Sequence, residues 1–264
     1  MLAQQRQASI LDRVRRHGGA RVADLVRVLG VSDMTIRRDI EVLAERGLVE
    51  KVHGGAVAVD GATDEPGYAA KAEQQRAEKT AIAQAAAALA KPGSAVGISA
   101  GTTTAALAWE LINVPELTVV TNSIPVADVF YHHGRSDQTV VLTGGTRTPS
   151  DALVGPVAQE AAARINLDML FLGVHGMSLR AGFTTPNLSE ADTNRSLVAA
   201  ARRLVVLADH TKWDLIGIAT IAALTDAHVL VSDPQLPQEA RTELAAQVGE
   251  LIIGGDGDAE EPAK

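Results

Sequence analysis

The chain opens with three stretches in which apolar residues recur at helical spacing, each followed by glycine. The predicted apolar faces are Ile10, Leu11 and Val14; Val22, Val26 and Leu29; and Ile36, Ile40 and Leu43. Ser32 is a suitable N-cap for the third helix, and the short turn before it predicts a helix-turn-helix. Two apolar runs at 48–52 and 56–59, on either side of His53-Gly54-Gly55, predict the strands of a small wing.

A different pattern follows a polar stretch at 59–68, which we interpret as a linker. An Ala-rich segment predicts a long helix at about 69–90, and short apolar runs then alternate with helical patterns. The predicted strands are 95–98, 117–121, 139–143, 169–173, 204–208, 229–232 and 251–253. The predicted helices between them are 103–111, 124–132, 156–164, 190–202 and 237–248. This alternation predicts an α/β domain at 69–253 with a mostly parallel sheet, and the acidic, Gly-rich segment 254–264 predicts a disordered tail.

Charge divides the chain in the same way. Residues 1–58 hold ten basic and seven acidic residues, a net charge of +3, whereas the remainder holds 14 basic and 25 acidic residues, a net charge of −11. Such asymmetry indicates that the N-terminal domain, residues 1–58, binds nucleic acid. The absence of cysteine excludes disulfides and thiolate chemistry. With no apolar run of membrane-spanning length, no signal-peptide core and no clustered metal-binding motif, we expect a cytoplasmic protein without membrane contact, metal or cofactor.

The third predicted helix has the layout of a recognition helix. Arg38 lies opposite the apolar face, and Thr35 and Arg37 flank it. Hydroxyl and guanidinium groups reach phosphates and base edges, although the sequence does not decide which of the two an arginine contacts. The candidate DNA-contacting residues are Ser32, Thr35, Arg37, Arg38, Lys51 and His53. The alternative is a solvated helix with ordinary charge pairs.

Polar turns follow several predicted strands. Residues 99–104 place Gly101 and three threonines between a strand and a helix, where backbone N–H groups and hydroxyls can bind an anion. The alternative here is a capped helix behind a tight turn. Thr121-Asn122-Ser123, Thr143-Gly144-Gly145 and the pair Asp209 and Lys212 end other strands. Because ligands bind beyond the carboxyl ends of strands in open α/β sheets, these turns favour a polar, phosphorylated ligand.

Several of these motifs occur together in one known family. V-S-D-M-T-I-R-R-D-I-E-V-L, followed by G-L-V-E-K-V-H-G-G-A, resembles the signature of DeoR-type bacterial transcriptional regulators. G-T-T-T, L-T-V-V-T-N-S, L-T-G-G, G-V-H-G and L-A-D-H-T-K resemble the effector-binding domain of that family. The resemblance covers about residues 4–253. It implies a C-terminal fold similar to ribose-5-phosphate isomerase, and a domain that senses phosphorylated sugars or related metabolites.

By position, the resemblance also implies a set of effector-binding residues. They are Ser99, Gly101, Thr102, Thr103, Thr121, Asn122, His175, Glu190, Asp209 and Lys212. Three positions depart from the family pattern. Family members often carry an acid where this chain has Ser99, aspartate or serine where it has His175, and lysine where it has Asn194. These departures leave the phosphate loop intact but put the identity of the sugar in doubt.

An isomerase-like enzyme is one alternative function. Isomerisation needs a carboxylate base close to the substrate carbon, but the turn Gly173-Val174-His175-Gly176 contains none. Asp168 precedes its strand, which predicts a position at the opposite end of the sheet, and Glu190 and Asp151 stay open as bases. A DNA-binding oligomer without an effector is the other alternative. We expect no enzymatic activity, but a homo-oligomeric repressor of a sugar or carbohydrate operon that binds operator DNA and is released by a phosphorylated sugar.

Overall fold

The computed structural model describes residues 3–17, 19–45, 49–52, 54–58 and 67–255, and it divides the chain into two compact units, Met1–Gln74 and Gln75–Lys264. Each unit has a hydrophobic core of its own. The predicted tail lies outside the described residues, apart from Gly254 and Gly255, and so does most of the predicted linker, since 59–66 are not described.

The N-terminal unit is a winged helix-turn-helix. Its elements are α1 (Ala3–His17), β1 (Gly19–Arg21), α2 (Val22–Leu29), α3 (Asp33–Glu45), β2 (Val49–Val52), β3 (Gly55–Ala58) and α4 (Tyr68–Ala72). Apolar residues from all three major helices meet in its core, and Ile10, Leu25 and Ile36 are fully buried there. The three helices and the two wing strands predicted from the sequence are confirmed. The antiparallel sheet has a third strand that was not predicted, because β1 pairs with β3 in the order β1-β3-β2.

The prediction of one long helix at 69–90 is wrong. The helix is divided into α4 and α5 (Arg76–Ala87), and Gln75 between them has a φ of 50°. A residue in the left-handed region cannot lie inside a right-handed helix, so α4 and α5 stay separate despite the high helix propensity of the alanines in both. The boundary between the two units falls at this break.

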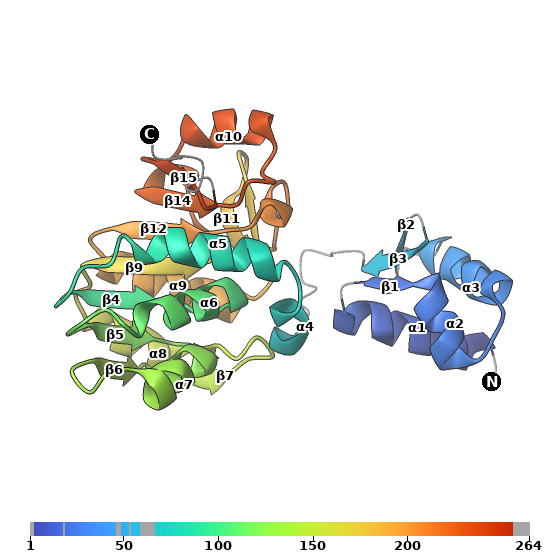
Figure 1. Cartoon of the computed structure of the whole chain (residues 1–264), viewed down its shortest axis with the longest axis horizontal. Helices are drawn as coiled ribbons and strands as arrows, with labels where there is room; N and C mark the ends of the chain where they lie inside the picture. The colour runs from blue at the N-terminus through green and yellow to red at the C-terminus, as the bar shows by residue number, and fades with distance from the viewer. Residues whose placement is uncertain (1–2, 18, 46–48, 53, 59–66, 256–264) are drawn as a thin grey trace, which may run out of the picture. The chain divides into compact units, whose positions relative to one another are not determined.

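A sheet of seven parallel strands forms the centre of the C-terminal unit, in the order β15-β14-β12-β9-β4-β5-β6 (Figure 1). The strands are β4 (Ala95–Ile98), β5 (Thr118–Thr121), β6 (Thr139–Leu142), β9 (Met169–Gly173), β12 (Leu204–Leu207), β14 (Val229–Ser232) and β15 (Leu251–Ile253). Each coincides with a predicted strand to within a residue at either end. The inner strands are apolar runs buried on both faces, as expected for a parallel sheet covered by helices.

Helices cover the sheet in two groups. On one face, α5 packs against α6 (Thr102–Leu111), which packs against α7 (Ile124–His133). A second pair, α8 (Pro156–Ala163) and α9 (Leu188–Ala200), lies on the other face, behind the sheet in Figure 1. The last helix, α10 (Gln238–Ala245), connects β14 to β15. No helix among the described residues has the combination of length and apolarity needed to cross a bilayer.

Five short antiparallel strands were not predicted. They are β7 (Thr146–Arg147), β8 (Leu153–Val154), β10 (Gly176–Ser178), β11 (Gly182–Thr185) and β13 (Ala219–Ala222). The hairpin β7-β8 stands alone, and the others form a sheet in the order β10-β11-β13. Two turns of 3₁₀ helix, His210–Lys212 and Leu224–Asp226, follow β12 and β13.

Candidate functional site

The helix α3 presents a polar surface that its own apolar face holds in place. Ile36, Ile40 and Leu43 are at most 2% exposed, whereas Met34 on the other side is 81% exposed. The N–H of Thr35 donates to Ser32 Oγ at 3.3 Å, which confirms the predicted N-cap. Gly30 ends α2 with a φ of 66°, and its N–H donates to the Val26 carbonyl. The turn therefore fixes where α3 begins and which side of it faces outward.

The predicted DNA-contacting residues differ in how they are held. Ser32 Oγ and Thr35 Oγ1 are hydrogen-bonded to each other at 2.8 Å. Arg37 Nε donates to Asp33 Oδ1 at 2.5 Å, and this hydrogen bond raises the pKa of Arg37 above its ordinary value. Arg38 is exposed, and no described residue forms an ion pair with it. Arg38 is therefore the guanidinium on α3 that is most available to a phosphate or a base edge.

The wing contributes one further described cation, Lys51. Its Nζ lies 2.5 Å from Glu41 Oε1 on α3, and the hydrogen bond lowers the pKa of the Glu41 carboxyl. The pair connects β2 to α3 at the surface, where it adds little stability. His53, the other wing residue predicted to contact DNA, lies outside the described residues.

An ion pair that the sequence analysis missed joins α3 to α1. Asp39 is 4% exposed and accepts hydrogen bonds from Arg6 Nε at 2.5 Å and Gln7 Nε2 at 3.1 Å. The one signal in the sequence was an acid among the core positions Ile36, Ile40 and Leu43. Arg6 is 33 residues away along the chain, so spacing alone could not identify the partner. The pair fixes α3 on the body of the unit.

We predict that Asp39→Ala loosens this unit, because it leaves the Arg6 guanidinium without its acceptor in a largely buried position. Amide exchange in α1 and α3 of the full-length chain should become about tenfold faster or more, as read by mass spectrometry. The matched control is Asp24→Ala, since Asp24 pairs with Arg27 at the exposed surface. Equal exchange in the two variants would contradict a stabilising role for Asp39.

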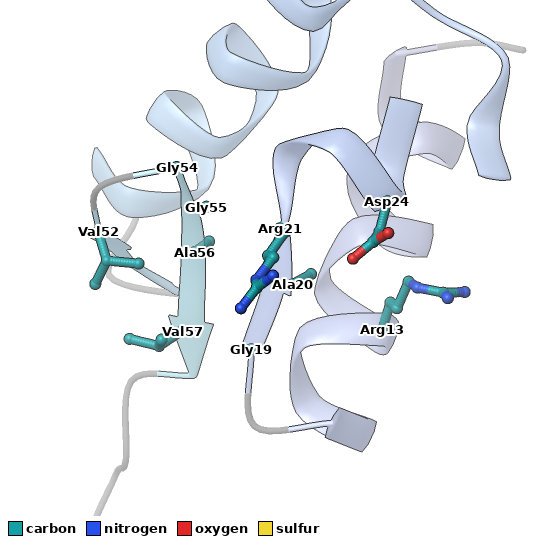
Figure 2. Close-up of a pocket in the computed structure, with 10 residues that line it drawn as sticks. All are labelled: Arg13, Gly19, Ala20, Arg21, Asp24, Val52, Gly54, Gly55, Ala56 and Val57. Atoms are coloured by element: carbon teal, nitrogen blue, oxygen red, sulfur yellow. The ribbon is translucent and has the colours of Figure 1, made fainter. Parts of the chain in front are cut away.

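An open depression beside the wing holds two further guanidinium groups. Arg13 from α1 and Arg21 from β1 line it, together with Asp24 and the backbone of Gly54 and Gly55 (Figure 2). Arginine side chains and backbone N–H groups of this kind contact DNA phosphates, which position a protein without reading sequence. Neither arginine was predicted from the sequence to contact DNA.

At the carboxyl ends of β4, β5 and β9, three predicted effector residues connect neighbouring strands. Ser99 Oγ accepts the N–H of Gly173 at 3.0 Å. Asn122 Oδ1 accepts the N–H of Ala100 at 3.0 Å, and its Nδ2 donates to the Leu153 carbonyl in β8. Thr121 Oγ1 donates to the Ile98 carbonyl at 2.6 Å. All three side chains are at most 1% exposed, so they shape this edge of the sheet through bonds within the protein.

Gly101 begins the turn that leads into α6, and its backbone requires glycine. Its φ is 151°, and a Cβ there would lie 3.1 Å from Thr104 Oγ1. The first helical residues after it are Thr102 and Thr103, whose backbone N–H groups belong to the open first turn of α6. A helix N-terminus with adjacent hydroxyls suits the phosphate of a ligand.

Asp209 and Lys212 share the turn after β12. Asp209 is 1% exposed, and its Oδ1 accepts the N–H of Thr211 at 3.0 Å and the Thr211 hydroxyl. Its Oδ2 is buried without a hydrogen-bond partner among the described residues. Lys212 is partly exposed at the end of the same turn. A buried carboxylate oxygen that lacks a donor suits a ligand hydroxyl, because leaving it unpaired is costly.

Glu190 and His175 each have a hydrogen-bond partner in β11. The Glu190 carboxylate is 8% exposed and accepts hydrogen bonds from Thr148 Oγ1 at 2.7 Å, from Ser150 and from Thr185. These hydroxyls come from the β7-β8 hairpin and from β11, which the sequence did not predict. His175 is partly exposed, and its backbone N–H donates to the Thr184 carbonyl.

A second buried carboxylate was missed near Asp209. Asp233 follows β14, is fully buried, and lies 3.0 Å from His210 Nδ1 in the turn after β12. It also accepts the backbone N–H groups of His210 and Gln235. The described residues contain no group of three or more His, Asp or Glu side chains arranged to hold a metal ion.

Comparison with known families accounts for both units. Residues 6–62 match the DeoR-like helix-turn-helix domain, and residues 74–234 match the DeoR C-terminal sensor domain. This chain belongs to the DeoR family. The resemblance found in its recognition-helix and strand-end motifs is thereby confirmed.

DeoR-family relatives align with nearly the whole chain. The HTH-type transcriptional regulator GlpR of Haloferax volcanii is 36% identical and covers 97% of this chain and 99% of its own length. The HTH-type transcriptional repressor CsqR of Escherichia coli is 30% identical, with 94% of each chain covered. Ribose 5-phosphate isomerase A of Methanocaldococcus jannaschii matches 51% of this chain and 53% of its own, at 17% identity and a TM-score of 0.38. The chain is thus a DNA-binding transcriptional regulator with a C-terminal sensor domain.

Proposed function

We propose that this regulator is a repressor of a sugar or carbohydrate operon, that it acts in the cytoplasm, and that a phosphorylated sugar releases it from operator DNA. The surface of α3 is the observation that supports binding to operator DNA. Arg38 and Thr35 lie on a helix that Ile36 and Ile40 bury and that Asp39 ties to α1. Such a helix can enter the major groove while its position on the protein stays fixed.

The effector would bind at the carboxyl edge of the parallel sheet. The N-terminus of α6, with Gly101, Thr102 and Thr103, would hold the phosphate. Lys212 would supply a cation, and Asp209 Oδ2 would accept a hydrogen bond from a sugar hydroxyl. Ser99, Thr121 and Asn122 would support this site by fixing the strand ends, and His175 and Glu190 would lie at its margin.

We propose that the site binds its ligand without turning it over. The turn Gly173–Gly176 that leaves β9 has no carboxylate. Asp168 accepts the N–H of Ala95, the first residue of β4, and so belongs to the opposite edge of the sheet. The runner-up function is a sugar-phosphate isomerase fused to a DNA-binding domain, with Glu190 or Asp151 as the carboxylate base.

Fluorescence anisotropy tests the proposal. The full-length protein is titrated onto DNA from upstream of its own operon, with and without a panel of phosphorylated sugars. Tight, salt-dependent binding that one compound relieves is the expected result. A 100-fold weakening of operator affinity corresponds to a coupling free energy of about 2.7 kcal/mol. Binding that no compound alters would favour a regulator without such an effector, and turnover of a sugar phosphate would favour the enzyme.

A further inference from the structure

The outer strand β6 leaves its edge and its side chains open. Val140, Val141 and Leu142 are 36%, 39% and 45% exposed, although successive residues of a strand point to opposite faces. At the other end of the sheet, all three residues of β15 are partly buried. Edge strands are normally protected by charge, proline or a bulge, but the seven residues 139–145 contain no charged residue and no proline. This strand is therefore suited to pair with another strand.

The hydrogen bonds to β5 show which residues of β6 face outward. Thr139 and Thr143 donate their N–H groups to the carbonyls of Leu117 and Thr121, at 2.9 and 3.0 Å. Because the backbone direction alternates along a strand, the N–H and C=O groups of Val140 and Leu142 point away from β5, to the open edge. A partner strand would pair with these two residues.

We propose that the open edge of β6 pairs antiparallel with β6 of a second copy of this chain, about a two-fold axis that passes beside Val141. The sequence of the strand is the reason for choosing a second copy as the partner. Thr139-Val140-Val141-Leu142-Thr143 reads as a chemical palindrome around Val141. An isologous two-fold contact brings each side chain onto its counterpart, so a palindrome is complementary to itself.

The register follows from the axis. A two-fold axis perpendicular to the sheet keeps the two faces of each copy aligned, so one residue must lie opposite itself. With Val141 at the centre, Val140 lies opposite Leu142 of the partner subunit, and Thr139 lies opposite Thr143 of the partner subunit. These are apolar and hydroxyl pairs of the kind that stabilise sheets. Centring on Val140 instead would oppose Gln138 to Leu142 of the partner subunit, which is a poorer match.

The neighbouring surface enlarges the contact. A stable interface buries roughly 1,200–2,000 Å² in total, more than one strand edge supplies. Tyr131, which is 82% exposed, lies on α7, and α7 packs on β6. Val157 on α8 is 63% exposed and lies beside Gly144, at the end of the strand. The charges that flank the strand are paired within one copy, as Arg135 with Asp137 and Arg147 with Asp151, so they add no net repulsion.

A single cysteine tests both the pairing and its register, because the natural chain has none. In this register Val141 and its counterpart form a non-hydrogen-bonded pair, whose Cα atoms lie about 4.5 Å apart. That separation permits a disulfide. We expect Val141→Cys, treated with oxidised glutathione, to give mostly covalent dimer on non-reducing electrophoresis.

The matched control is Val140→Cys, one residue along the same strand. Its sulfur would lie diagonally from its counterpart, with Cβ atoms roughly 7 Å apart, so cross-linking should be at least about tenfold slower. Ile218→Cys, at an exposed residue just before β13, measures random collision. Cross-linking of Val141→Cys that is no faster than that of either control would overturn the proposal. So would sedimentation of the unmodified chain as a monomer at tens of micromolar. No DNA is used, so this result is independent of the proposed function.

Discussion

Replacing Arg38 with alanine should weaken operator binding by about 5- to 150-fold for each protomer on the DNA, because each protomer loses a contact worth about 1–3 kcal/mol. Arg38 is exposed on α3 and has no ion-pair partner among the described residues, so the substitution removes the contact to DNA without breaking one within the protein. Anisotropy on operator DNA measures the effect, and ligand binding to the C-terminal unit should not change.

Two comparisons sharpen this experiment. Arg37→Ala should lower operator affinity less than Arg38→Ala, since the Arg37 guanidinium is already paired with Asp33. Arg164→Ala, at the exposed residue after the last turn of α8, should leave operator affinity unchanged. If Arg38 contacts a phosphate, the salt dependence of log affinity should fall by about 0.9 per contact; if it reads a base, discrimination between operators should fall instead. Equal affinities for Arg38→Ala and Arg164→Ala would reject α3 as the recognition helix.

Lys212→Gln should give a repressor that stays on its operator when the sugar phosphate is added. Losing a charge-assisted hydrogen bond to a phosphate costs about 1.5–3 kcal/mol, so release should need roughly 10- to 150-fold more ligand. Operator affinity without ligand should equal that of the parent. A titration of the preformed complex with the sugar phosphate that releases the parent measures the shift.

Lys91→Gln is the matched control, because this exposed lysine precedes β4 and so belongs to the amino edge of the sheet. It should leave the release curve in place. If both variants respond like the parent, the ligand does not depend on Lys212, and the site at the end of β12 has been assigned wrongly.

The regular part of the fold was predictable from local pattern. Buried parallel strands are short apolar runs, and the helices between them repeat every three to four residues, so all seven strands of the sheet could be located. Strands such as β7 and β11 have two to four residues and depend on partners distant in sequence, so no local pattern marks them. The break at Gln75 was hidden by alanines that favour helix on both sides.

The positions of the candidate site residues could be predicted from the sequence better than their contacts with other side chains. Ser32, Arg38, Asp209 and Lys212 could be singled out because they follow element boundaries or lie opposite an apolar face. The side chains that contact these residues could not be predicted. The contact of Asp39 with Arg6 depends on how two helices pack, and such contacts leave no periodic signal.

The separate cores of the two units have a thermodynamic consequence. Among the described residues, the core of the N-terminal unit shares no residue with the core of the C-terminal unit, so we expect each unit to unfold cooperatively by itself. Heating should melt them in two calorimetric transitions, so no single Tm describes this molecule. Operator DNA should raise the melting temperature of the N-terminal unit directly, and the proposed sugar phosphate should raise that of the C-terminal unit. The shift that each ligand causes in the transition of the opposite unit then measures the free energy by which the two sites communicate.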